Sequence, residues 1–229
     1  MEITRITVGE TNNYLLRGEE GVVLIDAGPP GAASAIMVGA TANGIRPEEV
    51  RLILVTHAHL DHYGAVKAVQ EWCGAPVAAH PDAPGQSRDR WAALPPAQTV
   101  RGSLIRWLYL FLSPLFPVIS LEADVFLGEG HSLAAYGVDA RIVALPGHSQ
   151  DSLGLVTAEG EAFVGDLLVN YTVPSKPIYL WSQDAWQGSY RRLQALEPRM
   201  IYVGHGEPFS GAKLDRVYPA RYQLRWWVR

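Results

Sequence analysis

The stretch LILVTHAHLDHYG, residues 52–64, joins an uninterrupted apolar run to a dense cluster of polar side chains. The run from Leu52 to Val55 predicts a buried strand. Four side chains that bind metals in many proteins follow it, and they are His57, His59, Asp61 and His62. Because open α/β sheets place their sites at the carboxyl ends of strands, the cluster predicts a functional site at a sheet edge. A helix is expected to follow, from about Asp61 to Trp72, and to end at Gly74.

Three further polar side chains share this context, since each follows an apolar strand and a glycine. They are His148 in IVALPGHS, Asp166 in AFVGD and His205 in MIYVGHG. Glycine lets the backbone turn sharply there and admits the next side chain to a crowded site. A lone histidine is usually structural, but five of the seven histidines in such contexts predict one shared site. His80 and His131 lack the context and are expected to be structural.

The seven candidate ligands suffice for two metal ions. His57 and His59 lie on one side of the turn and are expected to bind one ion together with His148. Asp61 and His62, one step further along, are expected to bind a second ion together with His205, and the two carboxylate oxygens of Asp166 would bridge the pair. Imidazole and carboxylate ligands suit zinc, with iron and manganese as alternatives. Cys73, the single cysteine, lies away from the strand ends and is expected to be a small packed residue.

The complete set resembles the metal ligands of the metallo-β-lactamase-fold hydrolases. The matching residues are His57-X-His59-X-Asp61-His62, Gly147-His148, Gly165-Asp166 and Gly204-His205, and the match extends from NNYLL through LIDAG to GHG. The resemblance implies an α+β fold, an αββα four-layer sandwich with two central mixed β-sheets, helices outside and a dinuclear site at one edge. It also implies that Asp26 of LIDAG lies near the metals and orients a ligand imidazole, with a turn-forming role as the alternative.

Within that superfamily the set is most similar to the glyoxalase-II-like branch. The common zinc β-lactamases have a cysteine ligand where Asp166 stands and no metal-binding histidine where His62 stands. Thioesterases, lactonases and phosphodiesterases of the glyoxalase-II-like branch are the closer match. Glyoxalase II also has a C-terminal helical domain that binds glutathione, and only about two dozen residues follow His205 here.

The resemblance implies a hydrolase for a small-molecule substrate. Two cations roughly 3.5–4 Å apart lower the pKa of a water held between them toward about 7, and the hydroxide attacks an ester, thioester, lactone or phosphodiester. Asp61 is the expected catalytic residue, which holds this nucleophile and moves its proton; a helix-capping role is the alternative. A second hypothesis is a persulfide-dioxygenase-like oxidoreductase with one iron bound by His57, His148 and Asp166. A third is a binding or regulatory protein that kept the fold, against which the intact ligand set argues.

Composition limits the remaining choices. A chain of 229 residues with 48% hydrophobic and 18% charged residues predicts one domain, 1–229, with a sizeable core. The net charge of −4 shows no basic excess, so no nucleic-acid partner is expected and an RNase-Z-like nuclease is disfavoured. One cysteine and the absence of a signal-peptide pattern at the start of the sequence favour a cytoplasmic location.

Residues 84–121 are interpreted as a helical, apolar insertion. Its segment LIRWLYLFLSPLFPVISL, residues 104–121, is short for a membrane span and contains two prolines, so no transmembrane segment is expected. A lid over the site, a lipid-facing helix and a homodimer contact remain open, and a buried core helix is the alternative. The side chains that would contact an amphipathic substrate or a membrane surface are Arg101, Arg106, Trp107 and Tyr109.

Two groups of residues outside the ligand set carry weaker expectations. Ser149 and Tyr171 closely follow ligands and could face the site, although an ordinary loop role is favoured for both. Trp226 and Trp227 near the C-terminus are expected to serve in packing or dimer contacts.

Overall fold

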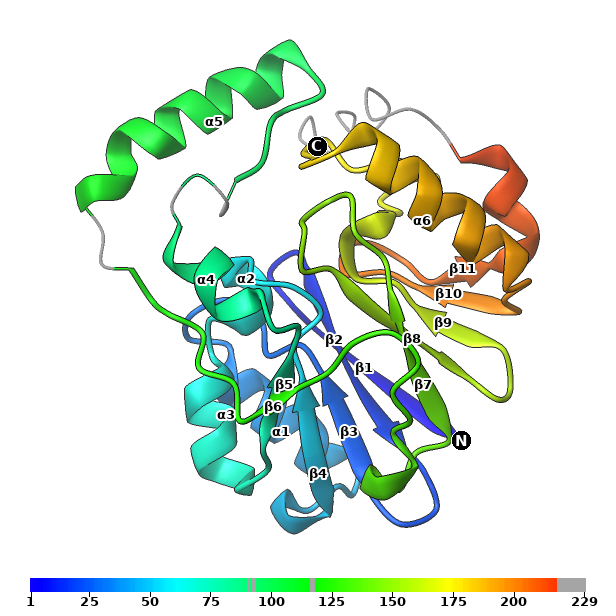
Figure 1. Ribbon diagram of the computed structural model, residues 1–229. Helices are drawn as coiled ribbons and strands as arrows, with labels where there is room; N and C mark the ends of the chain where they lie inside the picture. Colours follow the sequence, from blue (N-terminus) through cyan, green and yellow to red (C-terminus); the bar gives the residue numbers. More distant parts are fainter. Residues whose placement is uncertain (90, 92–93, 116–117, 218–229) are drawn as a thin grey trace.

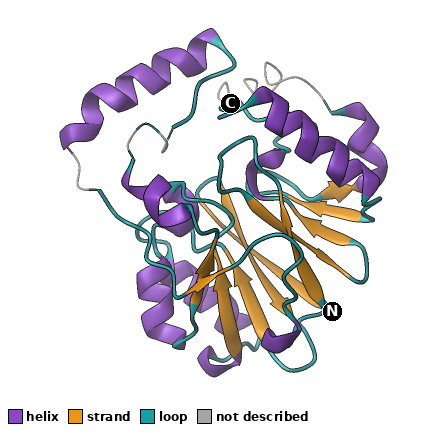
Figure 2. Cartoon of the chain, in the orientation of Figure 1, coloured by secondary structure: helices purple, strands orange, loops and turns teal. Residues whose placement is uncertain are grey.

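The computed structural model describes residues 1–89, 91, 94–115 and 118–217, and it contains two facing β-sheets with helices on their outer sides (Figures 1 and 2). Within these residues the first sheet has the strand order β1-β2-β3-β4-β5-β6, and the second has the order β11-β10-β9-β8-β7. Each sheet contains parallel and antiparallel pairs.

The elements follow the chain in two sheet-forming halves. The strands of the first sheet are β1 (Glu2–Val8), β2 (Thr11–Arg17), β3 (Val22–Ile25), β4 (Val50–Leu54), β5 (Val77–Ala79) and β6 (Val125–Phe126). Those of the second are β7 (Ala140–Ala144), β8 (Leu153–Thr157), β9 (Glu161–Phe163), β10 (Met200–Tyr202) and β11 (Phe209–Ser210). The α-helices are α1 (Ala33–Ala42), α2 (Leu60–Tyr63), α3 (Val66–Cys73), α4 (Ala83–Arg88), α5 (Val100–Leu112) and α6 (Gln183–Ala195).

Strand β3 shows how one strand contributes to two cores. Its successive side chains point to opposite faces of the sheet, and all four are buried. Val22 and Leu24 pack into a core that includes residues of α1 and α3. Val23 and Ile25 pack into a second core, shared with the other sheet. A continuous apolar strand is therefore the expected sequence for a sheet covered on both faces.

A third core lies on the outer face of the second sheet. There, Trp186 and Leu193 of α6 pack with Ala162 of β9 and Ile201 of β10. Three apolar cores thus separate four layers, in the order helices, sheet, sheet, helices. The predicted αββα sandwich with two mixed sheets is confirmed.

The structure changes one expected element of the first half. The sequence predicted one helix from Asp61 to Trp72, but α2 and α3 are separate, with Gly64 and Ala65 between them. A Cβ atom at Gly64 would lie 2.4 Å from Cδ of Pro30, so the chain passes too close to Pro30 for any side chain. Helix α3 ends as predicted at Gly74, which has a left-handed backbone with φ of 70°.

Helix α5 lies in the predicted insertion and stands apart from the two sheets in Figure 1. Most of its large apolar side chains are exposed, so the alternative of a buried core helix is wrong. No helix among the described residues is long and apolar enough to cross a membrane. Trp226 and Trp227 lie outside the described part of the chain, as does the side chain of Arg101.

Candidate metal centre

The seven predicted ligands lie together at one edge of the sandwich, on loops from both sheets. The loop after β4 and the start of α2 carry His57, His59, Asp61 and His62. The loops after β7, β9 and β10 carry His148, Asp166 and His205. Strand ends that are distant in sequence therefore meet at one place, as the strand-end pattern predicted.

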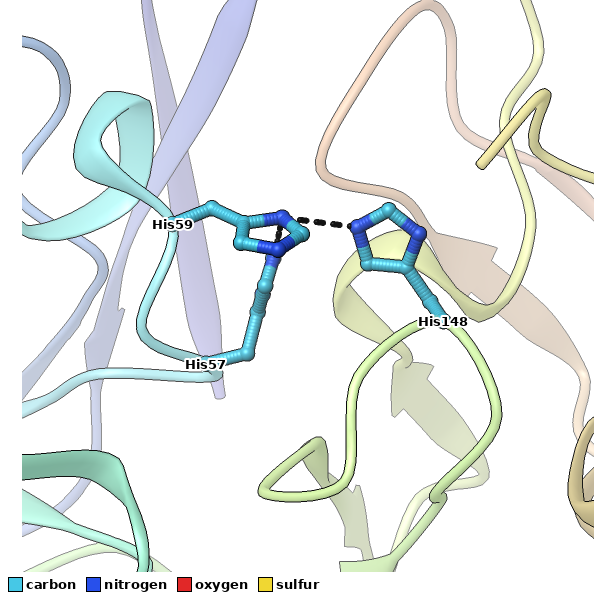
Figure 3. Close-up of side chains that lie close together, drawn as sticks. All are labelled: His57, His59 and His148. Atoms are coloured by element: carbon cyan, nitrogen blue, oxygen red, sulfur yellow. Dashed lines mark hydrogen bonds between the residues drawn. The ribbon is translucent and has the colours of Figure 1, made fainter. Parts of the chain in front are cut away.

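His57, His59 and His148 form the first group, in which rings from two loops point toward one another (Figure 3). Nδ1 of His59 lies 3.1 Å from Nε2 of His57 and 2.9 Å from Nε2 of His148. All three side chains are buried. These nitrogens are close enough together to bind one cation.

Asp61, His62 and His205 form the second group. Nε2 of His205 lies 3.4 Å from Nε2 of His62 and 3.3 Å from Oδ2 of Asp61. His62 is fully buried, whereas the side chain of Asp61 is 47% exposed. Asp61 therefore lies at the mouth of the site. Its capping alternative is wrong, because α2 has His59 at its N-cap and no side-chain capping bond, and Asp61 instead accepts a hydrogen bond from Thr11.

Asp166 lies between the two groups. Its Oδ2 is 3.5 Å from Nε2 of His148 in the first group and 3.2 Å from Nε2 of His205 in the second. Its Oδ1 is buried without a hydrogen-bond partner among the described residues, and lies 3.5 Å from Nε2 of His62. A buried carboxylate oxygen without a donor is costly unless a cation or proton faces it.

Gly204 is required here because of space. Its φ is not positive, unlike that of Gly147 and Gly165. A Cβ atom at Gly204 would lie 2.3 Å from Oδ1 of Asp166 and 2.8 Å from Cε1 of His62. The glycine beside His205 thus makes room for a neighbouring ligand, while Gly147 and Gly165 supply the turns that the sequence predicted.

Backbone carbonyls orient two of the imidazoles. Nδ1 of His148 lies 2.9 Å from the carbonyl oxygen of Tyr179, and Nδ1 of His205 lies 2.8 Å from that of Glu10. A carbonyl only accepts hydrogen bonds, so each Nδ1 carries the proton and donates. In the neutral form of either ring the lone pair then lies on Nε2, which points into the cluster.

Asp26 and Thr56 orient two more rings. Asp26 Oδ2 lies 2.8 Å from Nδ1 of His62 and accepts a hydrogen bond from Oγ1 of Thr56 at 2.9 Å. Because that hydroxyl donates to Asp26, it accepts from Nδ1 of His57, 3.0 Å away. Asp26 adopts a left-handed backbone with φ of 60°, which costs of order 1 kcal/mol for a residue other than glycine. Its role in orienting an imidazole, inferred from the resemblance, fits this geometry.

The inward-facing atoms are therefore imidazole nitrogens and carboxylate oxygens that face one another, an arrangement that favours a bound cation. Burial, then the neighbouring His59, lowers the pKa of His148 to about 4, so that ring is neutral near pH 7. Burial alone would lower the pKa of His62, but nearby carboxylates, Asp61 first, raise it to about 9. The second group and Asp166 thus hold enough negative charge to attract positive charge, and their ligand types fit divalent metals such as zinc.

Comparison with known proteins gives the same result. The sequence profile of the Metallo-beta-lactamase superfamily matches residues 6–205. The chain belongs to this superfamily. It is 28% identical to the probable metallo-hydrolase YflN of Bacillus subtilis (strain 168), over 90% of this chain and 84% of that protein. The predictions of a metallo-β-lactamase fold and of a hydrolase of this superfamily are confirmed.

Two further relatives of this metallo-β-lactamase-superfamily chain are similar to it, one in sequence and one in fold. The hydroxyacylglutathione hydrolase of Anaeromyxobacter dehalogenans (strain 2CP-C) is 42% identical over 73% of this chain, but over only 50% of its own length. The solved structure of the BLEG-1 B3 metallo-beta-lactamase is 25% identical, with a TM-score of 0.72 over 93% of this chain and 97% of that one. The fold is thus shared along nearly the whole chain, and the higher sequence identity is with the glyoxalase-II-like relative.

One buried acid that shapes the first group was not predicted from the sequence. Asp151 accepts a hydrogen bond from the backbone N–H of Ala58 at 2.8 Å, and so fixes the loop between His57 and His59. Burial raises the pKa of Asp151, and its Oδ1 has no hydrogen-bond partner among the described residues. Its only sequence signal was its place three residues after His148.

The remaining candidates lie where they were expected from the sequence, with one exception. His80 and His131 are outside the cluster, and each accepts a hydrogen bond from a nearby backbone N–H. Ser149 is buried against Ser152 at 2.7 Å, in keeping with a loop role. The exception is Tyr171, whose ring lies beside that of His205 with centroids 6.3 Å apart. Cys73 is partly buried and packs against the first core.

Asp26→Asn is expected to lower metal affinity by about 10–100-fold. Asparagine fits the left-handed backbone, but it lacks the charge that holds Nδ1 of His62 and the hydroxyl of Thr56. Competition with a chromophoric chelator would measure the change. Asp139→Asn, at an exposed position, is the control and should bind metal like the wild type. Unchanged affinity in Asp26→Asn would contradict the orienting role.

Proposed function

We propose that the chain hydrolyses an ester-type bond with two divalent metal ions, and that a thioester is the first substrate to test. The observation that carries this proposal is the convergence of six donor side chains in two groups of three, with the carboxylate of Asp166 between them. The 42% identity to a hydroxyacylglutathione hydrolase, a thioester hydrolase by name, supports the choice of substrate. Lactones, phosphodiesters and simple esters are the other candidates.

In this proposal His57, His59 and His148 hold one ion, and Asp61, His62 and His205 hold the other. Asp166, whose carboxylate faces both groups, would help to hold both ions. Bound ions of this kind supply Lewis acidity and activate a water molecule as the nucleophile. Zinc is the first choice for these ligands, with iron and manganese as alternatives.

The protein side chains have separate tasks in this reaction. Asp26, Thr56 and the carbonyls of Tyr179 and Glu10 hold the imidazoles in one tautomer, so each Nε2 stays available as a ligand. Asp61, at the mouth of the site, holds the attacking water and accepts its proton.

Exposed apolar side chains border the site and favour a substrate with an apolar part. Leu60 lies between His59 and Asp61 and is 39% exposed. Trp181 is 49% exposed, and its backbone N–H donates to the carbonyl of His148. Both would contact an acyl or similar group placed over the metal centre.

The oxidoreductase alternative requires a single iron bound by His57, His148 and Asp166. The second group favours two ions instead, because a one-iron site would not explain why Asp61, His62 and His205 also lie close enough together to bind a cation. Metal analysis separates the two hypotheses.

Purified protein is expected to bind close to two metal ions per chain and to hydrolyse at least one ester-type substrate. Elemental analysis after metal loading would measure the stoichiometry. A panel of thioesters, lactones, phosphodiesters and a chromogenic β-lactam would measure the activity. Protein that stays metal-free at saturating zinc would refute the proposal. One tightly bound iron with oxygen consumption would favour the oxidoreductase.

A further inference from the structure

Helix α5 presents an apolar stripe to the solvent. Its members recur three or four residues apart, so they share one face of the helix. They are Val100, Leu104, Trp107, Leu108 and Phe111, and we name them the α5 stripe. Their exposed fractions run from 57% to 90%. This arrangement is the reverse of an ordinary surface helix, whose apolar face packs inward.

The inward face of α5 is mostly polar or small, with Leu110 as a half-buried apolar member, and its contacts fix the orientation of the helix. Gly102 and Ser113, the residue that caps the helix, are buried. The Nε atom of Arg106 donates to the carbonyl of Leu94 at 2.8 Å, and its guanidinium lies 5.4 Å from the centre of the Trp91 ring. The α5 stripe therefore faces outward because the polar face is bound to the protein.

The charge of the surrounding segment is one-sided. Residues 90–121 contain no aspartate or glutamate, although the chain has 23 acidic residues and a net charge of −4. Their only charged residues are Arg90, Arg101 and Arg106. Arg106 is bound to the protein, but the segment as a whole has a net positive charge, and an exposed apolar face in such a segment complements an anionic lipid surface. Tryptophan, present in the stripe as Trp107, is also favoured at the membrane interface.

We propose that the α5 stripe docks on a bilayer that contains anionic lipid, with the helix lying in the plane of the headgroups. Helix α5 has 13 residues and is about 20 Å long, whereas the hydrocarbon core is about 30 Å thick, so α5 lies on the membrane rather than crossing it. A second copy of the chain is a poorer fit. A stable protein interface takes roughly 20–30 residues a side, and the stripe offers five large side chains.

The docking face is connected to the candidate metal centre. Ala97, just before α5, forms a β-bridge with Tyr179, and Gln98 N–H donates to the carbonyl of Ile178 at 2.7 Å. The carbonyl of Tyr179 in turn orients His148. Figure 1 shows α5 on the same side of the sheets as α2, which carries Asp61 and His62. Docking would therefore place the metal centre near the lipid surface.

Vesicle co-sedimentation of the full-length protein would test the docking, and it needs no metal-dependent activity. The vesicles would be phosphatidylcholine with and without phosphatidylglycerol, at low and high sodium chloride. The test variant is Trp107→Ser combined with Phe111→Ser, because both side chains are exposed and the helix keeps its bound face. Val38→Ser, which removes an exposed apolar side chain from α1, is the matched control.

Wild-type protein and Val38→Ser are expected to bind the phosphatidylglycerol vesicles equally, and more weakly at high salt. The double variant is expected to bind at least about tenfold more weakly, since two large apolar side chains no longer enter the interface. Equal binding to neutral vesicles would overturn the anionic-lipid assignment. No vesicle binding by the wild type would overturn the docking itself. If vesicles are not bound and sedimentation velocity shows a wild-type dimer that is absent in the double variant, the stripe is a dimer contact and the docking proposal is overturned.

Discussion

Asp166→Ala is expected to lower turnover by about 10³-fold or more and to reduce the metal content below two ions per chain. The Asp166 carboxylate contacts both groups of candidate ligands, at 3.5 Å from Nε2 of His148 and 3.2 Å from Nε2 of His205. Its loss would separate the two halves of the proposed centre. Metal chemistry of this kind contributes several kcal/mol to transition-state stabilisation, which corresponds to a loss of about this size.

Asp166→Asn refines this test. Asparagine keeps the shape of the side chain but offers one neutral oxygen where the proposed bridge needs two anionic ones. It is therefore expected to weaken both ions, which chelator competition would show as a lower affinity at each step of metal release. Asp139→Ala is the control at an exposed position. Circular dichroism should show all variants folded, because three separate apolar cores hold the sandwich. Two bound ions and near-native turnover in Asp166→Ala would rule out the bridging role.

The convergence of the seven candidate ligands was predictable from the sequence because their signal is local. Each follows an apolar strand, and a buried strand of a layered sheet ends at an edge where loops from different strands meet. The two-faced burial of β3 was predictable for the same reason, since its unbroken run of apolar residues suits only a strand covered on both sides.

The groups that orient the ligands had no comparable signal. The carbonyls of Tyr179 and Glu10 lie 31 and 195 residues from the histidines they contact, and every residue has a carbonyl. A glycine before His205 was predicted to matter for a sharp turn. Its actual role is to leave space for Asp166 and His62, which contribute the nearest atoms and are distant in sequence. Contacts of this type depend on how the two sheets are placed against each other, which no local pattern encodes.

The orientation of the insertion helix α5 could not be predicted from the sequence. The apolar, aromatic sequence of α5, with its two arginines, is compatible with a buried helix and with an exposed one, because hydrophobicity does not say what lies beside the helix. Only the contacts of Arg106 and the burial of Gly102 and Ser113 decide which face of α5 points inward. A helix that binds the protein by its polar face lies outside the usual rule for surface helices.

Asp61→Asn is expected to lower kcat by about 10²–10⁴-fold while metal is largely retained. The loss is that of general acid–base assistance. Burial acts to raise the pKa of Asp61, but the imidazoles of His62 and His205 lower it well below its usual value, so the side chain is a carboxylate at neutral pH. Asparagine has nearly the same size and keeps one oxygen toward His205. It has neither the charge to hold the attacking water nor a site to receive its proton.

Thr11→Val separates the position of Asp61 from its chemistry. Thr11 donates to Oδ2 of Asp61 at 3.3 Å, so its loss frees the carboxylate to move without removing it. A modest loss in Thr11→Val beside a large one in Asp61→Asn would identify the carboxylate itself as the acting group. Stopped-flow or steady-state kinetics at matched metal content would measure both. Near-native turnover in metal-loaded Asp61→Asn would assign the proton transfer to another group. Tyr171 would then be tested next, because its ring lies beside that of His205. Burial is the main reason that the pKa of Tyr171 is raised to about 12, so the phenol keeps its proton at neutral pH.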